Sequence, residues 1–461
     1  MDKIEKLHHN MTAGRIAPCI LKLALPNAVG LLVVAAYSLA DSYFVSHLGK
    51  EAGAAVGVTF SIHVLLQAVG YTLGMGGGSL LSRALGKKEN KRASEYAAVA
   101  FVLATLAGIA ITALGLAFQD PLLRFLGASE SNFSLASAYV KPLLWSAPAM
   151  SVAFVLSQLL RAEGKAIYSM VGLSVGSLLN IVLDPLLITG FDMGIAGASV
   201  ATLISQCVSV AVLLSAYVFH SSQIKLFSSL RISAFAHTGR ILIAGLPSFF
   251  RQGLSGLATV LLNRAAASAG DAAVLAMSVV SRLFLLVFSF CLGIGQGMMP
   301  VVGYNYGAGR TDRIKRAYVF AMLSASAVML FWGVLLYAAA PQILTLFQSG
   351  AEFLNVGTVA LRAQSAVLVT HGAVTCTILY LQAIGKPIRA TILASARQGI
   401  FFLPLIFLLP RYFGITGLEL TQPAADLLAF LFSVPFLLFA LKTAKKPTAE
   451  PTLPNNKTGQ I

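Results

Sequence analysis

Charged side chains are scarce in this chain. They make up 11% of its 461 residues, whereas hydrophobic residues make up 57%, and a soluble protein is usually about a quarter charged. This shortage excludes a soluble enzyme, a disordered protein and a nucleic-acid-binding protein with a hydrated basic face. It indicates a chain that is solvated mostly by lipid.

Cysteines and catalytic motifs are also few. The four cysteines lie in or beside apolar stretches without metal-ligand spacing, so we expect buried thiols and no disulfide. The sequence contains no Ser-His-Asp arrangement, HExxH or Walker motif. We therefore expect no enzyme and no cofactor. Any active transport would have to draw its energy from an ion gradient.

Long apolar runs dominate what is present. Because a spanning helix needs about 20 mostly apolar residues, the sequence predicts an all-α membrane protein with twelve transmembrane helices. They are expected at about 17–45, 52–76, 94–118, 139–160, 168–189, 196–219, 238–268, 272–298, 315–340, 357–383, 388–410 and 423–441. Residues 1–15 are polar, and we expect no cleavable signal.

Basic residues predict the orientation of these helices. Of the 33 Lys and Arg residues, 23 fall in one set of loops and 4 in the alternate set. Cytoplasmic loops carry such an excess. The net charge of +16 is therefore an orientation signal, and it predicts that both termini are cytoplasmic.

The two halves of the chain resemble each other. Glycines and prolines recur with an offset of 221 in Pro26/Pro247, Gly49/Gly270 and Gly164/Gly385, and GIAG at 194–197 matches GITG at 414–417 with an offset of 220. Six spans per copy give two parallel repeats around a central cleft, an arrangement typical of alternating-access carriers.

The repeat also predicts the organisation of the chain. We expect a cytoplasmic segment (1–15), an N-lobe (16–220), a cytoplasmic linker (221–237), a C-lobe (238–441) and a disordered cytoplasmic tail (442–461). The tail is expected to be disordered because it is rich in Pro, Lys and Thr and has few apolar residues.

Two acids lie well inside predicted spans, where ionisable residues are costly and commonly functional. Asp41 lies in the outer part of the first span, and Asp184 lies in the outer half of the fifth. We expect them to share a proton or Na⁺ site, to which Asn180, one turn before Asp184, also belongs. The alternative is that each acid caps a kinked helix or pairs with a buried arginine.

Pro26 and three arginines are further candidates within spans. Pro26 lies 15 residues before Asp41 and predicts a kink, which would be either a moving hinge or a static bend. Arg251, Arg282 and Arg397 lie deep in the second repeat. They would either have a structural role or line the cleft and bind an anionic headgroup.

Several motifs together resemble the multidrug and toxic compound extrusion (MATE) family, in the bacterial MepA-like branch. In the first half they are LP…D of the first span, LGKEAGAAVGV (48–58), SRALGKKENKRA (82–93), LRAEGK (160–165) and NIVLDPLLI…GIAGASVATLISQ (180–206). In the second half they are LPSFFRQGL (246–254), GYNYGAGR (303–310), LQAIGK (381–386) and ARQGIFFLPLIFLLP…GITG…QPAAD (396–426).

The resemblance implies roles for individual residues. Asp41 matches the first-helix carboxylate that takes the coupling ion, with Asn180, Asp184 and Thr202 beside it as ion-site residues, including any Na⁺ site. Tyr37, Tyr139 and Ser157 are assigned to the substrate site, and Pro26 to the proline whose bending accompanies protonation. Another branch carries acids in the C-lobe. This chain has Leu262 and Leu405 opposite Asp41 and Asp184, so we expect the C-lobe to lack such acids.

The expected function is that of a secondary antiporter in the inner membrane of a bacterium. It would export amphipathic, often cationic drugs in exchange for H⁺ or Na⁺, as a monomer that contacts lipid and binds no nucleic acid. A flippase for lipid-linked glycans is the alternative, and it predicts that Arg251, Arg282 and Arg397 converge in the cleft. A channel or passive receptor fits the repeat poorly.

Overall fold

The computed structural model describes residues 3–46, 48–128, 130, 132–219, 222–229 and 231–443. Over these residues the chain is almost entirely helical and contains no β-strand. The predicted all-α fold is confirmed. The predicted disordered tail lies outside the described residues, except for its first two.

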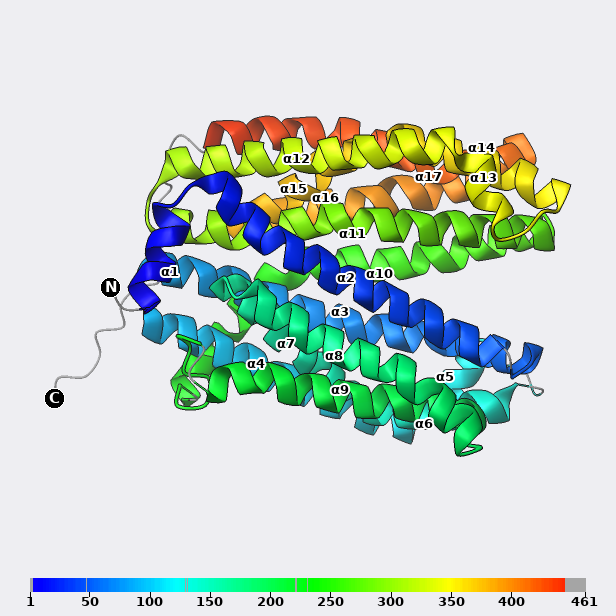
Figure 1. The fold of residues 1–461 in the computed structure, drawn as a ribbon, viewed down its shortest axis with the longest axis horizontal. Coiled ribbons are helices and arrows are strands. Elements are labelled where there is room, and N and C mark those ends of the chain that lie inside the picture. Colours follow the sequence, from blue (N-terminus) through cyan, green and yellow to red (C-terminus); the bar gives the residue numbers. More distant parts are fainter. Residues whose placement is uncertain are drawn as a thin grey trace.

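The helices form two packed groups, which are the upper and lower layers in Figure 1. The first group, here called the N-lobe, follows α1 (Lys3–Thr12) and contains α2 (Ile16–Ser46), α3 (Lys50–Gly86), α4 (Asn90–Ala117), α5 (Gln119–Phe125), α6 (Phe133–Trp145), α7 (Ala147–Glu163), α8 (Ala166–Pro185), η1 (Leu186–Gly190) and α9 (Gly194–Val218). The second group, the C-lobe, follows η2 (Ile232–His237) and contains α10 (Thr238–Ala267), α11 (Asp271–Gly307), α12 (Thr311–Ala338), α13 (Ala340–Thr345), α14 (Ala351–Val367), α15 (Thr370–Ala383), α16 (Pro387–Ser395), η3 (Ala396–Phe401) and α17 (Phe402–Thr443).

Most of the twelve predicted spans coincide with helices that could cross a membrane. In the described chain, eight helical segments are long and apolar enough to span a membrane, and ten if α6 with α7 and α14 with α15 each form one bent span. The two remaining predicted spans fall on α10, which is 30 residues long, and on the part of α17 beyond a break at Gly414, where φ is 58° and ψ −134°. The predicted lobe, linker and terminal boundaries stay predictions.

Glycine conformations reveal the internal repeat. Gly49 and Gly270, which precede α3 and α11, have φ of 117° and 106°. Gly194 and Gly414, at the matching loops late in each lobe, have φ of 56° and 58°. Glycine adopts such positive φ values without the steric cost that a side chain imposes. The two lobes therefore use the same turns at matching positions.

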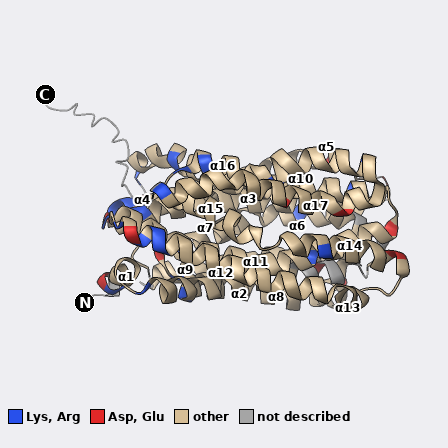
Figure 2. Ribbon diagram, turned by 90° about the horizontal axis from the view of Figure 1, so that it is seen from above, with Lys and Arg blue, Asp and Glu red and all other residues tan. Residues whose placement is uncertain are grey.

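Lys and Arg residues gather at the end of the molecule where the N-terminus lies (Figure 2). We call this end the basic end. It includes the α3–α4 turn with Lys87 and Lys88, and the α11–α12 turn with Arg310 and Arg313.

The two lobes are pressed together in the half nearest the basic end. A side chain at Gly76 of α3 would collide with the carbonyl of Ile241 on α10, and one at Gly86 would collide with the carbonyl of Tyr304 on α11. Glycine permits this close approach of helix backbones. The lobes are thus sealed here without room for an added methyl group.

The opposite half is more open. A Cβ added at Gly53 or Gly57 of α3, or at Gly253 of α10, would have no atom of the described chain within 4 Å, apart from its own helix and neighbours. Gly256, beyond Gly253 on α10, still approaches α3, since a Cβ there would lie 2.8 Å from Cγ1 of Val64. Close backbone contacts between the lobes are therefore concentrated at the basic end.

Candidate functional site

Four helices of the N-lobe bring the predicted ion-site residues together. Asp41 comes from α2, Tyr139 from α6, Asn180 and Asp184 from α8, and Thr202 from α9. The four-residue spacing puts Asn180 and Asp184 on one face of α8, and that face packs against α9: Nδ2 of Asn180 donates to Oγ1 of Thr202 at 3.4 Å. Thr202 in turn donates to the carbonyl of Ala198 at 3.1 Å.

Helix α8 changes geometry directly after its acid. Pro185 follows Asp184 and has no N–H to donate, and the next five residues form the π-helix η1. Oγ1 of Thr189 donates to the carbonyl of Pro185 at 2.6 Å. Short π-helical turns of this kind are frequent at functional sites.

The acids interact with each other and with tyrosine. The carboxyls of Asp41 and Asp184 lie within electrostatic range of each other. Both also lie within electrostatic range of the Tyr139 hydroxyl, and so does Tyr37, one turn before Asp41. Asp184 is fully buried, and Tyr37 and Tyr139 are each 6% exposed. The structure thus places four of the predicted site residues in one cluster.

Oxygen atoms in this cluster have unused acceptor capacity. Both carboxylate oxygens of Asp184, Oδ1 of Asp41 and Oδ1 of Asn180 are buried with no hydrogen-bond partner among the described residues. A buried carboxylate without a partner is strongly unfavourable. Protonation, a bound cation or water would satisfy these oxygens, and a cluster of hard oxygen atoms suits either a proton or Na⁺.

Ser157 lies elsewhere. Its hydroxyl forms a 2.7 Å hydrogen bond with Ser169, which also accepts from Nε of Arg161 at 2.8 Å. Ser169 precedes Asp184 on α8 by 15 residues, a rise of roughly 22 Å along a helix. The structure therefore does not bring Ser157 to the acids, and its substrate role stays a prediction.

Pro26 lies inside α2, which remains one helix through it. On either side of Pro26, Ala24 and Ala28 pack closely against Gly297 and Gly293 of α11. The part of α2 around Pro26 is thus packed against α11 of the C-lobe. Whether it bends stays a prediction.

A buried acid of the C-lobe corrects the sequence analysis. Asp426 on α17 is 2% exposed, although we expected the C-lobe to lack such acids. The comparison with Leu262 and Leu405 missed it because Asp426 has no acidic counterpart at the matching N-lobe positions. The QPAAD motif at the start of the last predicted span was the available signal.

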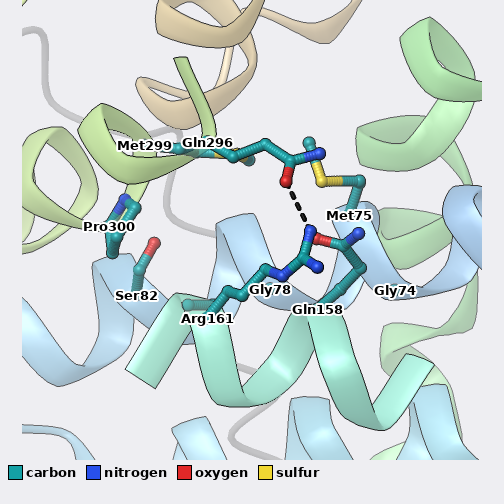
Figure 3. A pocket seen from close by; sticks show the side chains of 10 residues that line it. Gly74, Met75, Gly78, Ser82, Gln158, Arg161, Gln296, Met299 and Pro300 are labelled. Carbon is teal, nitrogen blue, oxygen red and sulfur yellow. Dashed lines mark hydrogen bonds between the residues drawn. The ribbon is translucent and has the colours of Figure 1, made fainter. Parts of the chain in front are cut away.

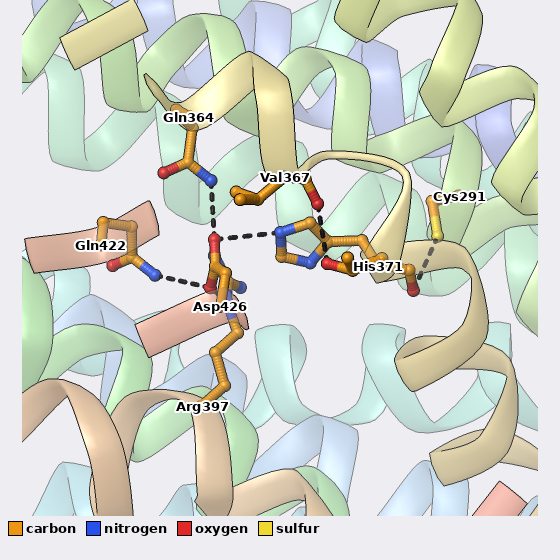
Figure 4. Close-up of polar contacts among 8 residues, drawn as sticks. Cys291, Gln364, Val367, His371, Arg397, Gln422 and Asp426 are labelled. Carbon is orange, nitrogen blue, oxygen red and sulfur yellow. Dashed lines mark hydrogen bonds and ion pairs between the residues drawn. The ribbon is translucent and has the colours of Figure 1, made fainter. Parts of the chain in front are cut away.

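Asp426 differs from the N-lobe acids because its oxygens are fully engaged (Figure 4). Oδ1 accepts from Nε of Arg397 at 2.6 Å and from Gln422 at 2.9 Å. Oδ2 accepts from Gln364 at 2.6 Å and pairs with Nε2 of His371 at 3.0 Å. This carboxylate is neutralised by the protein itself.

The three C-lobe arginines are placed differently from one another. Arg397 pairs with Asp426 and also stacks over the rings of Phe284 and Phe288, at 4.7 and 5.8 Å. Arg251 is within electrostatic range of Tyr71 on α3 and of Arg397. Arg282 is exposed.

Comparisons with known proteins agree with this architecture. The MatE family model matches residues 26–186 and 247–408, once in each lobe. The chain is 27% identical to the multidrug export protein MepA of Staphylococcus saprophyticus over 87% of this chain and 88% of that protein. It is 26% identical to MepA of Staphylococcus aureus, with coverages of 90% and 92%.

Solved structures match over nearly the whole chain. A crystal structure of MATE in complex with MaL6 superposes with a TM-score of 0.89 at 27% identity, covering 96% of this chain and 99% of that one. An outward-facing multidrug resistance MATE transporter of the MOP superfamily superposes with a TM-score of 0.88 at 28% identity and the same coverages. With both lobes matched by the family model, this chain belongs to the MatE family of membrane transporters.

Proposed function

We propose that this protein is a secondary active antiporter that exports amphipathic, often cationic drugs in exchange for H⁺ or Na⁺. The observation that carries the proposal is the pair of N-lobe acids with buried, unengaged oxygens, in a two-lobed molecule that is closed at one end. The MepA relatives, which are multidrug export proteins, support the substrate class.

The basic end is assigned to the cytoplasm by the positive-inside rule. Both termini would then be cytoplasmic, and the closed half would face the cytoplasm. In this orientation the arrangement is outward-facing, which is also how one superposed transporter is described.

Each residue of the N-lobe cluster has a role in the proposed cycle. Asp41 and Asp184 hold the coupling ion, with Asn180 and Thr202 as neutral oxygen ligands if the ion is Na⁺. Tyr37 and Tyr139 offer aromatic faces to a cationic drug. Binding of the coupling ion neutralises the acids. Loss of that ion restores a negative site that attracts the cationic drug, so the N-lobe binds the ion and the drug in turn.

Replacement of Asp41 tests this role. Asp41→Asn removes the charge and keeps the shape, so we expect efflux to be lost while the protein folds normally. Ethidium resistance and ethidium efflux are measured in cells that express the variant at the wild-type level. Asp192→Asn is the matched control, because Asp192 is an exposed acid of the same lobe. Normal efflux by Asp41→Asn would contradict the proposal.

The coupling ion is identified in reconstituted vesicles. Drug uptake is driven either by a Na⁺ gradient at fixed pH or by a pH gradient without Na⁺. We expect one of these gradients to drive transport in the wild type and neither to do so in Asp41→Asn. Equal downhill flux with both gradients collapsed would favour a passive carrier or channel.

The flippase alternative is less well supported. It requires arginines that are free to bind a pyrophosphate headgroup in the cleft. Arg397 is instead neutralised by Asp426, and Arg282 is exposed. This arrangement favours a structural role for Arg397 and therefore the drug antiporter.

A further inference from the structure

A small pocket lies between the lobes in the closed half, where α3, α7 and α11 meet (Figure 3). It is lined by Gly74, Met75, Gly78, Ser82, Gln158, Arg161, Ala162, Gln296, Met299 and Pro300. The centre of a water-sized sphere can move within about 10 Å³, which is room for one small occupant. The lining contains a cation and no acid.

Three hydrogen-bond donors in this lining are unused. Nη2 of Arg161, Nε2 of Gln158 and Nε2 of Gln296 are buried and have no acceptor in the described part of the chain. Each of the three residues is at most 4% exposed. Gln158 and Arg161 belong to the N-lobe, and Gln296 belongs to the C-lobe.

The remaining contacts of Arg161 do not neutralise it. Its Nε donates to Ser169, and its Nη1 donates to Oε1 of Gln296. Both partners are uncharged, so a buried guanidinium is left without a counter-charge from them. A buried charge without compensation is strongly unfavourable.

A water molecule would satisfy these groups poorly. Water accepts about two hydrogen bonds and must donate its own two hydrogens, whereas this lining offers three unused donors. A monatomic anion has no hydrogens of its own to place, and it compensates the charge of the guanidinium. The small space excludes sulfate, phosphate and carboxylate groups.

We propose that this pocket binds a single chloride-like anion that joins Arg161 and Gln158 of the N-lobe to Gln296 of the C-lobe. Because the ligands come from both lobes, the bound anion stabilises the closed end. Binding itself does not depend on the transport function. Only the consequence that the site divides when the lobes separate rests on the proposed alternating access.

Thermal unfolding of the purified full-length protein tests binding. Melting temperature is measured in equal concentrations of sodium chloride, sodium bromide and sodium gluconate, which have the same ionic strength and the same Na⁺. A ligand that binds only the folded state raises the melting temperature, so we expect chloride and bromide to raise it by a few degrees over gluconate. Equal melting temperatures in all three salts would overturn the proposal.

Two leucine substitutions locate the effect. Gln158→Leu and Gln296→Leu each remove a donor, and we expect them to lose most of the chloride-dependent shift. Gln382→Leu is the control, because Gln382 is also buried between helices but its amide donates to the carbonyl of Ala244. A full chloride shift in Gln296→Leu, or its loss in Gln382→Leu alone, would contradict the assignment.

Bromide gives a direct readout that does not depend on a variant folding. Crystals of the wild-type protein grown in bromide should show an anomalous peak between Arg161, Gln158 and Gln296. A refined water in that position, without anomalous signal, would refute the anion site and leave the proposed antiport function intact.

Discussion

At the scale of single residues, the two lobes treat their buried acids in opposite ways. Asp184 has two oxygens without a partner in the described structure, whereas Asp426 receives hydrogen bonds from Arg397, Gln364 and Gln422 and also pairs with His371. The first is suited to exchange an ion, and the second is suited to hold helices together.

A double-mutant cycle distinguishes these roles. Removal of one partner of a buried ion pair leaves an uncompensated charge, so we expect Asp426→Leu or Arg397→Met alone to destabilise the protein by about 3–5 kcal/mol. The double variant should recover much of this loss. The measurement is unfolding in detergent. Arg362→Met serves as control because Arg362 is bound only at the surface, near Tyr337. Additive effects in the double variant would argue against a pair.

The sequence predicted the N-lobe residues better than the C-lobe residues. Asp41 and Asp184 are isolated charges in long apolar runs, and such charges are visible without a structure. The partners of Asp426 are spread over four helical segments, from Gln364 on α14 to Gln422 on α17. Contacts between positions so far apart leave no local pattern. The unused donors of Gln158 and Gln296 could not be recognised from the sequence either, because these two residues are also far apart in the chain.

At the scale of elements, hydropathy predicted where helices cross but not where they break. The expected spans fall on observed helices, of which eight to ten are long and apolar enough to cross a membrane, since a span is defined by composition over about 20 residues. The bends of 49° between α6 and α7 and of 55° between α14 and α15 were not predicted. Neither were the π-helical segments η1 and η3, because their geometry depends on packing against neighbouring helices.

Helix α1 joins the two lobes at the basic end. His8 contacts the carbonyl of Gly86 on α3 at 3.3 Å. From the C-lobe, Nδ2 of Asn305 donates to the carbonyl of Met11 at 2.9 Å, and Arg310 donates to that of Thr12 at 3.0 Å. The helix thus spans the contact between α3 and α11.

Loss of this connection should ease opening of the basic end. Asn305→Leu removes a buried hydrogen bond between α11 and α1, so we expect a destabilisation of about 1–3 kcal/mol for that closed end. Spin labels placed on the α3–α4 and α11–α12 turns would report a larger population of long distances. Asn90→Leu, at the exposed start of α4, is the control and should leave the distances unchanged.

At the scale of the whole molecule, close glycine contacts hold the closed conformation. Gly76 has no room for a side chain against Ile241, whereas the space around Gly57 on the same helix is free of other described atoms. The half nearest the basic end therefore depends on backbone contact between the lobes, and Gly57 makes no such contact.

A pair of valine substitutions on α3 separates these halves. Gly76→Val should prevent full closure at the basic end, reduce efflux at least tenfold and increase the labelling of cysteines introduced at that end. Gly57→Val adds the same side chain where there is room, so near-normal efflux is expected. Equal loss of efflux in both variants would indicate a general folding defect.

The different states of the acids in the two lobes limit how much charge one transport cycle can move across the membrane. If only Asp41 and Asp184 exchange ions while Asp426 keeps its internal partners, one cycle can return at most two elementary charges through the N-lobe. Exchange of two protons for a monovalent cation moves net charge, so the membrane potential adds to the driving force. Exchange of one proton for a monovalent cation moves no net charge. The membrane potential then makes no contribution, and accumulation of the drug follows the pH difference alone.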